Sequence, residues 1–388
     1  MSSADLVKHK YIEEVTLGTT PAAALRLLNV VSSSIDGQIG TTVSNQISAA
    51  RVETDLIRTE GSTSGDLGIE WSYGAYNDFI EGAVGSDWST AVSYTASTID
   101  AVNADNSLND SATGFDNVNI LPGHWIKFTG FTGANIANNG VPCKVVSITP
   151  AKIVVSGITL VNDAAGEPVT IKAQSIRSGS TRKSYTIEKE FSDLSNTFVS
   201  HKGMVVNTMN ISASVGSIVT GSFGFNGTTT TYATTTVGTG ADLAAVSNQV
   251  FDPTDSFSTV YVDGVAFSGC IRSIDLTTTN NTRNTQCLGS LYPTSITLGT
   301  LGVTGNMEIY FNNYTMIEKF LNGTSFSLSY GFSDSAGNYL VVDMPNVKLN
   351  TATLSSIGKN SDVMTSLSFT ALYDSTDAYC FQMSSLAA

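Results

Sequence analysis

The spacing of hydrophobic residues changes abruptly within residues 65–86. Apolar residues first alternate with polar ones, and this period of two predicts a half-buried β-strand. They then follow the i, i+3, i+4, i+7 spacing of a short amphipathic helix, which Gly85 is placed to end. The strand positions are Leu67, Ile69, Trp71 and Tyr73, and the helix positions are Tyr76, Phe79, Ile80, Ala83 and Val84.

Residues 305–324 repeat this strand and helix. Met307, Ile309 and Phe311 form the apolar face of the second strand, and Gly323 ends the second helix, whose stripe is Tyr314, Ile317, Phe320 and Leu321. A strand ending in Phe-Ser-Asp follows each helix, and a β-hairpin pattern follows each of those strands. Because a helix of two or three turns is not stable alone in water, we expect each helix to lie on a sheet.

The two repeats differ by an insertion. Gly85 and Phe191 are 106 positions apart, whereas Gly323 and Phe332 are 9 apart, which leaves about 97 extra residues in the first repeat. Within them, residues 120–173 have short alternating strands separated by Gly, Pro and Asn-Asn-Gly turns. This pattern predicts a small, self-contained β-barrel.

These patterns predict a mainly β fold in which a module of about six or seven strands, with one short flanking helix packed on a sheet face, occurs twice, plus a small inserted β domain. The expected division is an N-terminal arm at 1–20, a first module at 21–89 and 181–228, the inserted domain at 90–180, a linker at 229–256, a second module at 257–374 and a C-terminal tail at 375–388. The Thr- and Gly-rich residues 225–240 fit either a linker or an edge strand.

Charge and composition narrow the functional classes. The formal net charge is −14, charged residues make up only 13% of the chain, and no dense Lys/Arg cluster occurs, so specific nucleic-acid binding is not expected. No apolar run approaches the roughly 18 residues of a membrane span, and the N-terminal residues lack the pattern of a signal peptide. We therefore expect synthesis in a cytoplasm, no membrane insertion, and a surface or assembly protein.

No residue pattern indicates catalysis, a cofactor or a metal site. The three histidines, His9, His124 and His201, have no metal-ligand spacing, and the four cysteines show no CxxC motif, although Cys270 and Cys287 would pair if they faced each other across a hairpin. No two acidic residues have a spacing that marks them as the carboxylate pair of a glycoside hydrolase, and a solvated strand face explains them better. Trp71 lies among the apolar positions of its strand, so core packing explains it better than sugar binding.

Two segments resemble siphophage tail tube proteins. They are YIEEVTLGTTPAAALRLLNV and VETDLIRTEGSTSGDLGIEWSYGAYNDFIEGAVGSDWS, which together run through residues 11–89. The resemblance is thinner over 181–225 and over the second module, and it does not cover the insertion. It implies sandwich modules that join edge to edge in rings, with rings stacked into a hollow tube. Since six modules usually close such a ring, a duplicated chain implies three chains per ring.

The resemblance implies a set of partners and surface residues. The partners are further copies of the chain, other tail proteins at the tube ends, and double-stranded DNA that passes without specific binding, within a virion tail made in the host cytoplasm. Candidate lumen-facing acidic residues are Asp66, Glu70 and Glu308. Candidate residues for ring stacking and assembly are Tyr11, Glu13, Glu14, Thr19, Pro21, Arg51 and Arg283. An inserted barrel is expected outside, because inside it would obstruct DNA.

Three other readings stay open at this point. The first is a β-sandwich adhesin, which the lack of a signal peptide and the repeated strand–helix unit disfavour. The second is a capsid or tail decoration protein that binds a surface partner. The third is a glycoside hydrolase, for which the sequence designates no carboxylate pair.

Overall fold

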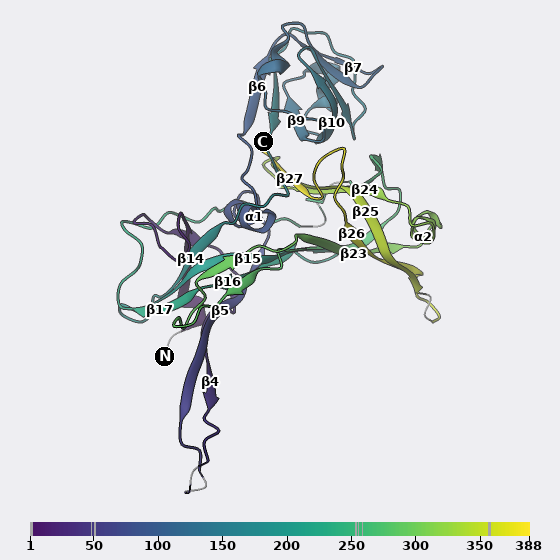
Figure 1. Cartoon of the computed structure of the whole chain (residues 1–388). Helices are drawn as coiled ribbons and strands as arrows, with labels where there is room; N and C mark the ends of the chain where they lie inside the picture. Colours follow the sequence, from purple (N-terminus) through teal and green to yellow (C-terminus); the bar gives the residue numbers. More distant parts are fainter. Residues whose placement is uncertain are drawn as a thin grey trace.

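The computed structural model describes residues 3–47, 49, 52–252, 254, 256–257, 259–355 and 358–388. Its strands pair in antiparallel ladders, and the mainly β expectation is confirmed. The chain has three parts in Figure 1: two sandwich modules side by side, and an inserted domain above them.

One sheet runs through both modules, and we call it the shared sheet. Its strand order is β4, β5, β16, β15, β20, β23, β26 and β25, and the short β3 also pairs with β5. The bounds are β3 (Ser32–Ser33), β4 (Asp36–Val43), β5 (Leu56–Glu70), β15 (Phe198–Ser214), β16 (Thr220–Gly227), β20 (Ile271–Thr279), β23 (Gly302–Tyr310), β25 (Tyr339–Ser355) and β26 (Met364–Ala371).

The second layer of each module contains the first half of a long strand. In the first module it comprises β1 (Val7–Glu14), β2 (Arg26–Leu28), β14 (Ser184–Phe191), β17 (Thr229–Ala233) and β15. In the second it comprises β13 (Ser175–Arg177), β18 (Tyr261–Val262), β19 (Val265–Ala266), β24 (Phe326–Ser333), β27 (Gln382–Leu386) and β25. Each long strand passes from one layer to the other where its partner changes, at Met204/Val205 in β15 and at Val347 in β25. The shared-sheet ladders shift register just beyond these points, at Val206/Thr208 and Leu349/Thr351.

Both helices lie where the spacing predicts them. They are α1 (Asn77–Val84) and α2 (Thr315–Leu321). A left-handed glycine follows each, Gly85 at φ 72° and Gly323 at φ 62°. The core residues of both modules form one cluster, in which Trp71, Phe79 and Phe223 of the first module and Phe332 of the second are almost fully buried.

The inserted domain has its own sheet and core. Its strand order is β6 (Val92–Ala96), β12 (Val169–Ala173), β9 (Trp125–Thr129), β10 (Cys143–Thr149), β11 (Lys152–Ser156), β8 (Ser107–Asp110) and β7 (Ile99–Val102). Short 3-10 helices lie at Ala4–Leu6, Gly114–Asn117 and Gly133–Asn138, and a separate hairpin is formed by β21 (Arg283–Thr285) and β22 (Ser295–Thr297).

Both chain ends differ from the expected arm and tail. β1 pairs with β14 over eight residues, and its Lys10 Nζ lies 2.5 Å from Glu190 and 2.8 Å from Asp242. The other end contains β27, which is buried between β25 and β13. These segments therefore belong to the second layers, because their backbone groups complete those sheets.

The expected linker at 229–256 is also part of the folded body. It begins with β17, which pairs with β15, so the edge-strand alternative holds for that piece. Further along, Phe251 is fully buried, and its ring stacks on Phe332 at 5.6 Å. The segment thus packs between the modules.

A buried ion pair attaches the inserted domain to the second module. Lys144 Nζ on β10 donates to both oxygens of Asp343 on β25, at 3.0 and 3.2 Å. Asp343 is fully buried, and it also accepts bonds from the hydroxyls of Ser329 and Tyr379. A buried carboxylate needs such partners, because its desolvation is costly.

Lys144→Met should destabilise the protein by about 3 kcal/mol, because it leaves Asp343 buried without its cation. The measurement is the free energy of unfolding in urea. The matched control is Lys152→Met, which removes the exposed pair with Asp105 and should cost under about 1 kcal/mol. Equal losses of unfolding free energy in the two variants would show that the buried pair stabilises the protein no more than the exposed pair does.

Candidate assembly surfaces

The pairing of β15 with β20 joins the two modules. Thr208 to Ser214 lie opposite Thr279 to Ser273 in continuous antiparallel register. Beyond the ladder, the Asn280 side chain donates to the carbonyls of Gly82 at 3.1 Å and Val206 at 2.9 Å. Because Asn280 is buried, these bonds satisfy carbonyls of the first module with an amide of the second. We call this the internal joint.

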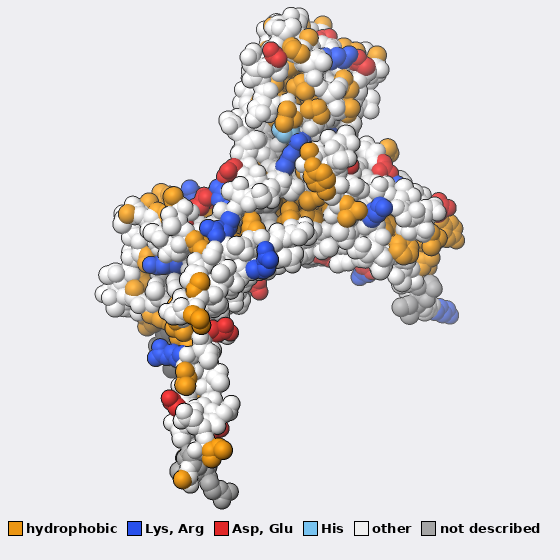
Figure 2. All heavy atoms as spheres, in the orientation of Figure 1, with side chains coloured by type: hydrophobic (Ala, Val, Ile, Leu, Met, Phe, Trp, Pro, Cys, Tyr) orange, Lys and Arg blue, Asp and Glu red, His pale blue; other side chains and the backbone are white. Residues whose placement is uncertain are grey.

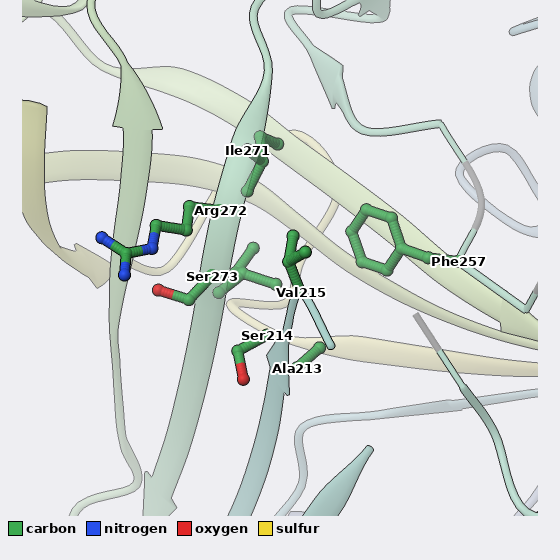
Figure 3. Close-up of a pocket in the computed structure, with 8 residues that line it drawn as sticks. Ala213, Ser214, Val215, Phe257, Ile271, Arg272 and Ser273 are labelled. Atoms are coloured by element: carbon green, nitrogen blue, oxygen red, sulfur yellow. The ribbon is translucent and has the colours of Figure 1, made fainter. Parts of the chain in front are cut away.

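A small cavity of about 50 Å³ lies in the internal joint. Ala213 to Val215 line one side, Ile271 to Ile274 line the other, and Phe257 closes it. In Figure 3 the Phe257 ring faces Val215, whereas Arg272 points away from the cavity. Residues of both modules therefore line this cavity together.

The first module has an open equivalent of this cavity. Gly65 pairs with Phe225 and Gly305 pairs with Phe369, so we align the modules on these glycines. Ser33 pairs with Leu67, and Ile274 pairs with Met307, so residues 30–33 correspond to 271–274. Residues 30–33 line a cavity of about 420 Å³. The rest of its lining comes from residues within 4–9 and from Lys189 and Phe191 of the same module, and no second module lies against residues 30–33 within the described part of the chain.

The opposite end of the shared sheet is also open. The second half of β25, Val347 to Ser355, pairs with β26 on one side only, within the described part of the chain. Leu349 pairs with Phe369, and Val206 pairs with Phe225, so this half of β25 corresponds to the part of β15 that holds β20. The shared sheet thus ends in two edges that match the two sides of the internal joint.

The free face of the shared sheet is polar. One row across its strands reads Glu70, Thr220, Ser212, Asp275, Asn306, Ser368 and Thr351, all held by strand register. Asp66 and Glu308 occupy the same face, and Glu308 lies 3.5 Å from the half-exposed Arg272. Figure 2 shows the corresponding underside as a hollow between the β4–β5 hairpin and the far end of the molecule. The three acidic candidates therefore share one surface.

Two of the assembly candidates are used inside the subunit, which corrects that expectation. Tyr11 is buried, and its hydroxyl donates to Asp78 at 2.9 Å. The buried Glu14 carboxylate accepts bonds from the amides of Gly18 and Gly203 and from the hydroxyls of Ser184 and Thr186. Neither side chain is exposed for contact with another subunit.

The other assembly candidates lie in different places. Glu13 forms a 2.9 Å ion pair with Lys183. Thr19 and Arg283 are exposed, Pro21 is partly exposed, and Arg51 lies outside the described residues. The structure does not bring them together into one site. Asn280, the contact that closes the internal joint, was missed because a lone Asn after a strand has no sequence signature.

Three absences hold for the described residues. No group of three or more His, Cys, Asp or Glu side chains is placed to hold a metal ion there. In the same part of the chain, no helix is long and apolar enough to cross a membrane. All four cysteines are free, so Cys270 and Cys287 are not paired.

Two histidines lie in the second layer beside Lys189. His9 is directly opposite Lys189 across β1 and β14, and His201 is nearby on β15, where its Nδ1 lies 2.9 Å from the Thr230 hydroxyl. Burial and the Lys189 charge lower the pKa of each imidazole to about 4, and Asp36 partly offsets this for His201. Both rings are therefore neutral at pH 7.

The chain matches the family model described as phage tail tube protein over residues 7–371. Among curated protein sequences, none matches the chain.

The protein should lose stability as pH falls from about 6.5 to about 4. In this window the unfolded histidines bind protons that the folded ones do not, so acid favours unfolding, by on the order of 3 kcal/mol for His201 alone once the pH is below 4. Urea unfolding at pH 7.5, 5.5 and 4.5 measures this loss. A His9→Gln, His201→Gln variant should show a shallower pH dependence, and identical slopes would refute the assignment.

Proposed function

Because the chain belongs to the phage tail tube protein family, we propose that it forms rings of three chains, each chain filling two neighbouring positions. Stacked rings would then form the conduit for genome delivery. The observation that supports this proposal best is the internal joint together with its two unpaired counterparts. One chain contains a complete joint and both halves of another.

The internal joint supplies the register of the joint between chains. Thr208, Asn210 and Ser212 pair with Thr279, Thr277 and Asp275. In the corresponding positions, Thr351, Thr353 and Ser355 of one copy would pair with Gln38, Asp36 and Ser34 of the next. The contact is head-to-tail, so it either closes into a ring or continues as a helix. Closure satisfies both unpaired edges, which would otherwise invite uncontrolled strand addition.

The polar face of the shared sheet would line the lumen. Its side chains are mainly Ser, Thr and Asn, with Asp66, Glu70, Asp275 and Glu308 as acidic residues. Such a surface offers little to hold phosphates, and its charge repels them. Double-stranded DNA would therefore pass without specific binding.

The inserted domain would lie on the outside of the tube. It sits beyond α1, on the side of the shared sheet opposite the polar face (Figure 1). We retain as proposals the module bounds 21–89 with 181–228 and 257–374 and the inserted domain at 90–180, but extend the first module by β1 and the second by β27. A structural role without catalysis or cofactor, and synthesis in the host cytoplasm, are also retained as proposals. Other tail proteins at the tube ends would be further partners, and Glu13, Thr19, Pro21 and Arg283 stay candidates for ring stacking.

A disulfide designed across the proposed joint between chains tests the ring. Asn207 O accepts from Asn280 N, and Val215 N donates to Arg272 O, which makes Asn210 and Thr277 a non-hydrogen-bonded pair. Such pairs have Cα atoms about 4.5 Å apart, within disulfide range. Thr353→Cys with Asp36→Cys, in a Cys270→Ser, Cys287→Ser background, should therefore give disulfide-linked species of two and three chains after oxidation.

The off-register control is Thr353→Cys with Thr42→Cys, six positions along β4, and it should not cross-link. Negative-stain electron microscopy of the same samples should show rings with six lobes. Rings built from six chains would contradict the proposal, because each chain would then fill one position. Rings without the cross-link would overturn the register.

Reversing charge on the polar face should make the tube retain DNA. Tubes of Glu70→Lys, Glu308→Lys protein, assembled with short duplex DNA, should protect it from nuclease, and the protection should fall as salt rises. The control variant, Asp100→Lys with Asp116→Lys, carries the same charge change on the inserted domain. It should leave bound DNA open to digestion, and equal protection would place the polar face elsewhere than the lumen.

A further inference from the structure

The two helices differ at one position that faces the internal joint. Ser86 N and Thr324 N donate to the carbonyls of Glu81 and Lys319, so the helix ends align on their left-handed glycines. This alignment places Phe320 where α1 has Gly82. A Cβ on Gly82 would lie 2.9 Å from Val206 Cγ2 and 3.0 Å from the Tyr185 hydroxyl. The first module thus has no room for a side chain there, whereas the second has a phenyl ring.

The surface around α2 is apolar and uncovered. Only Met316 of α2 is buried, whereas α1 buries five residues. Exposed hydrophobic side chains near it are Leu321 at 74%, Tyr314 at 62%, Leu354 at 44% and Tyr310 at 37%. Figure 2 shows hydrophobic side chains gathered at this end of the molecule.

The residue that would face α2 follows from the register. Thr279 pairs with Gly302, and Gln38 pairs with Ser62, so the residue after each, Asn280 or Ile39, occupies the same place. Asn280 reaches Gly82 and Val206. The counterparts of those two residues are Phe320 and Leu349. Ile39 is 42% exposed, and Ile35, four residues earlier on the same face, is buried in the core.

We propose that Ile39 of one copy packs against Phe320 and Leu349 of a second copy. This inference rests on the ring proposed above and names the contact that closes it. The joint between chains then uses an apolar pair where the internal joint uses an amide and two carbonyls.

The difference makes the two joints incompatible with each other. Ile39 placed at Gly82 would leave two buried carbonyls without a donor, and Asn280 placed at Phe320 would bury an amide against a ring. Wrong pairings are therefore disfavoured on both sides, which is how specificity between similar interfaces is usually achieved. The end of one chain is thus directed to the start of another and not to its own middle.

A double-mutant cycle tests the contact. Ile39→Ala and Phe320→Ala should each raise the concentration for half-maximal ring formation by about tenfold, because each removes buried apolar area. The double variant should be no worse than about the poorer single variant, because both remove the same contact. Light scattering against concentration measures assembly, and thermal unfolding of the monomer checks that α2 is intact. Val265→Ala, an exposed aliphatic change on β19, should leave assembly unchanged.

The outcomes separate this inference from the ring itself. Suppose that the Thr353→Cys, Asp36→Cys protein cross-links, but the increases in half-maximal concentration caused by the two alanine substitutions multiply in the double variant. The ring is then supported and the Ile39–Phe320 contact is refuted. Single variants that assemble as well as the parent chain also refute it. If the cysteine pair does not cross-link and rings do not form, the ring proposal itself has failed.

Discussion

Backbone pairing between β15 and β20 is the interaction on which the rest of the structure depends. It converts two sandwiches into one body, because the inner layers become a single sheet with a common core on one face and a polar surface on the other. An unpaired strand edge in a β protein exposes backbone N–H and C=O groups that can pair with other chains. Here one pair of edges is satisfied within the chain, and the matching outer pair is the surface that we propose for assembly.

The long strands make this arrangement possible. Each of β15 and β25 has 17 residues and belongs to both layers of its module. A register shift near the middle turns the strand, so one half pairs in the outer layer and the other half supplies an edge of the shared sheet. A short strand would leave the edge unsupported. The layer-spanning strand holds it against the core and fixes its direction.

Local periodicity predicted the duplicated strands, both helices and the inserted domain, because each of those elements buries one face. It could not predict β27, whose sequence Gln382–Leu386 reads as polar although all five residues are buried. The resemblance placed Glu14 among the assembly residues, whereas in the structure its buried carboxylate accepts hydrogen bonds from a hydroxyl of β14 and an amide of β15. In both cases the partners are distant in sequence, so the signal is absent from any local window. The alternation of residues predicts that one face of each sheet is polar. The continuity of this face across both modules depends on the pairing of β15 with β20, which residue spacing does not reveal.

In the ring proposed above, joining two positions in one chain changes the thermodynamics of closure. Each association of free subunits costs several kcal/mol of translational and rotational freedom. With the internal joint formed during folding, a six-position ring needs three chains to meet instead of six, and the remaining joints can be individually weaker. Weaker joints separate more readily when misplaced, so errors can be corrected before the ring closes. The two kinds of joint must also be distinguished from each other, because the internal joint and the proposed joint between chains share a backbone register. A duplicated module can differ without disturbing that register in the side chains at one position: Asn280 beside Gly82 inside the chain, and, in our proposal, Ile39 beside Phe320 between chains.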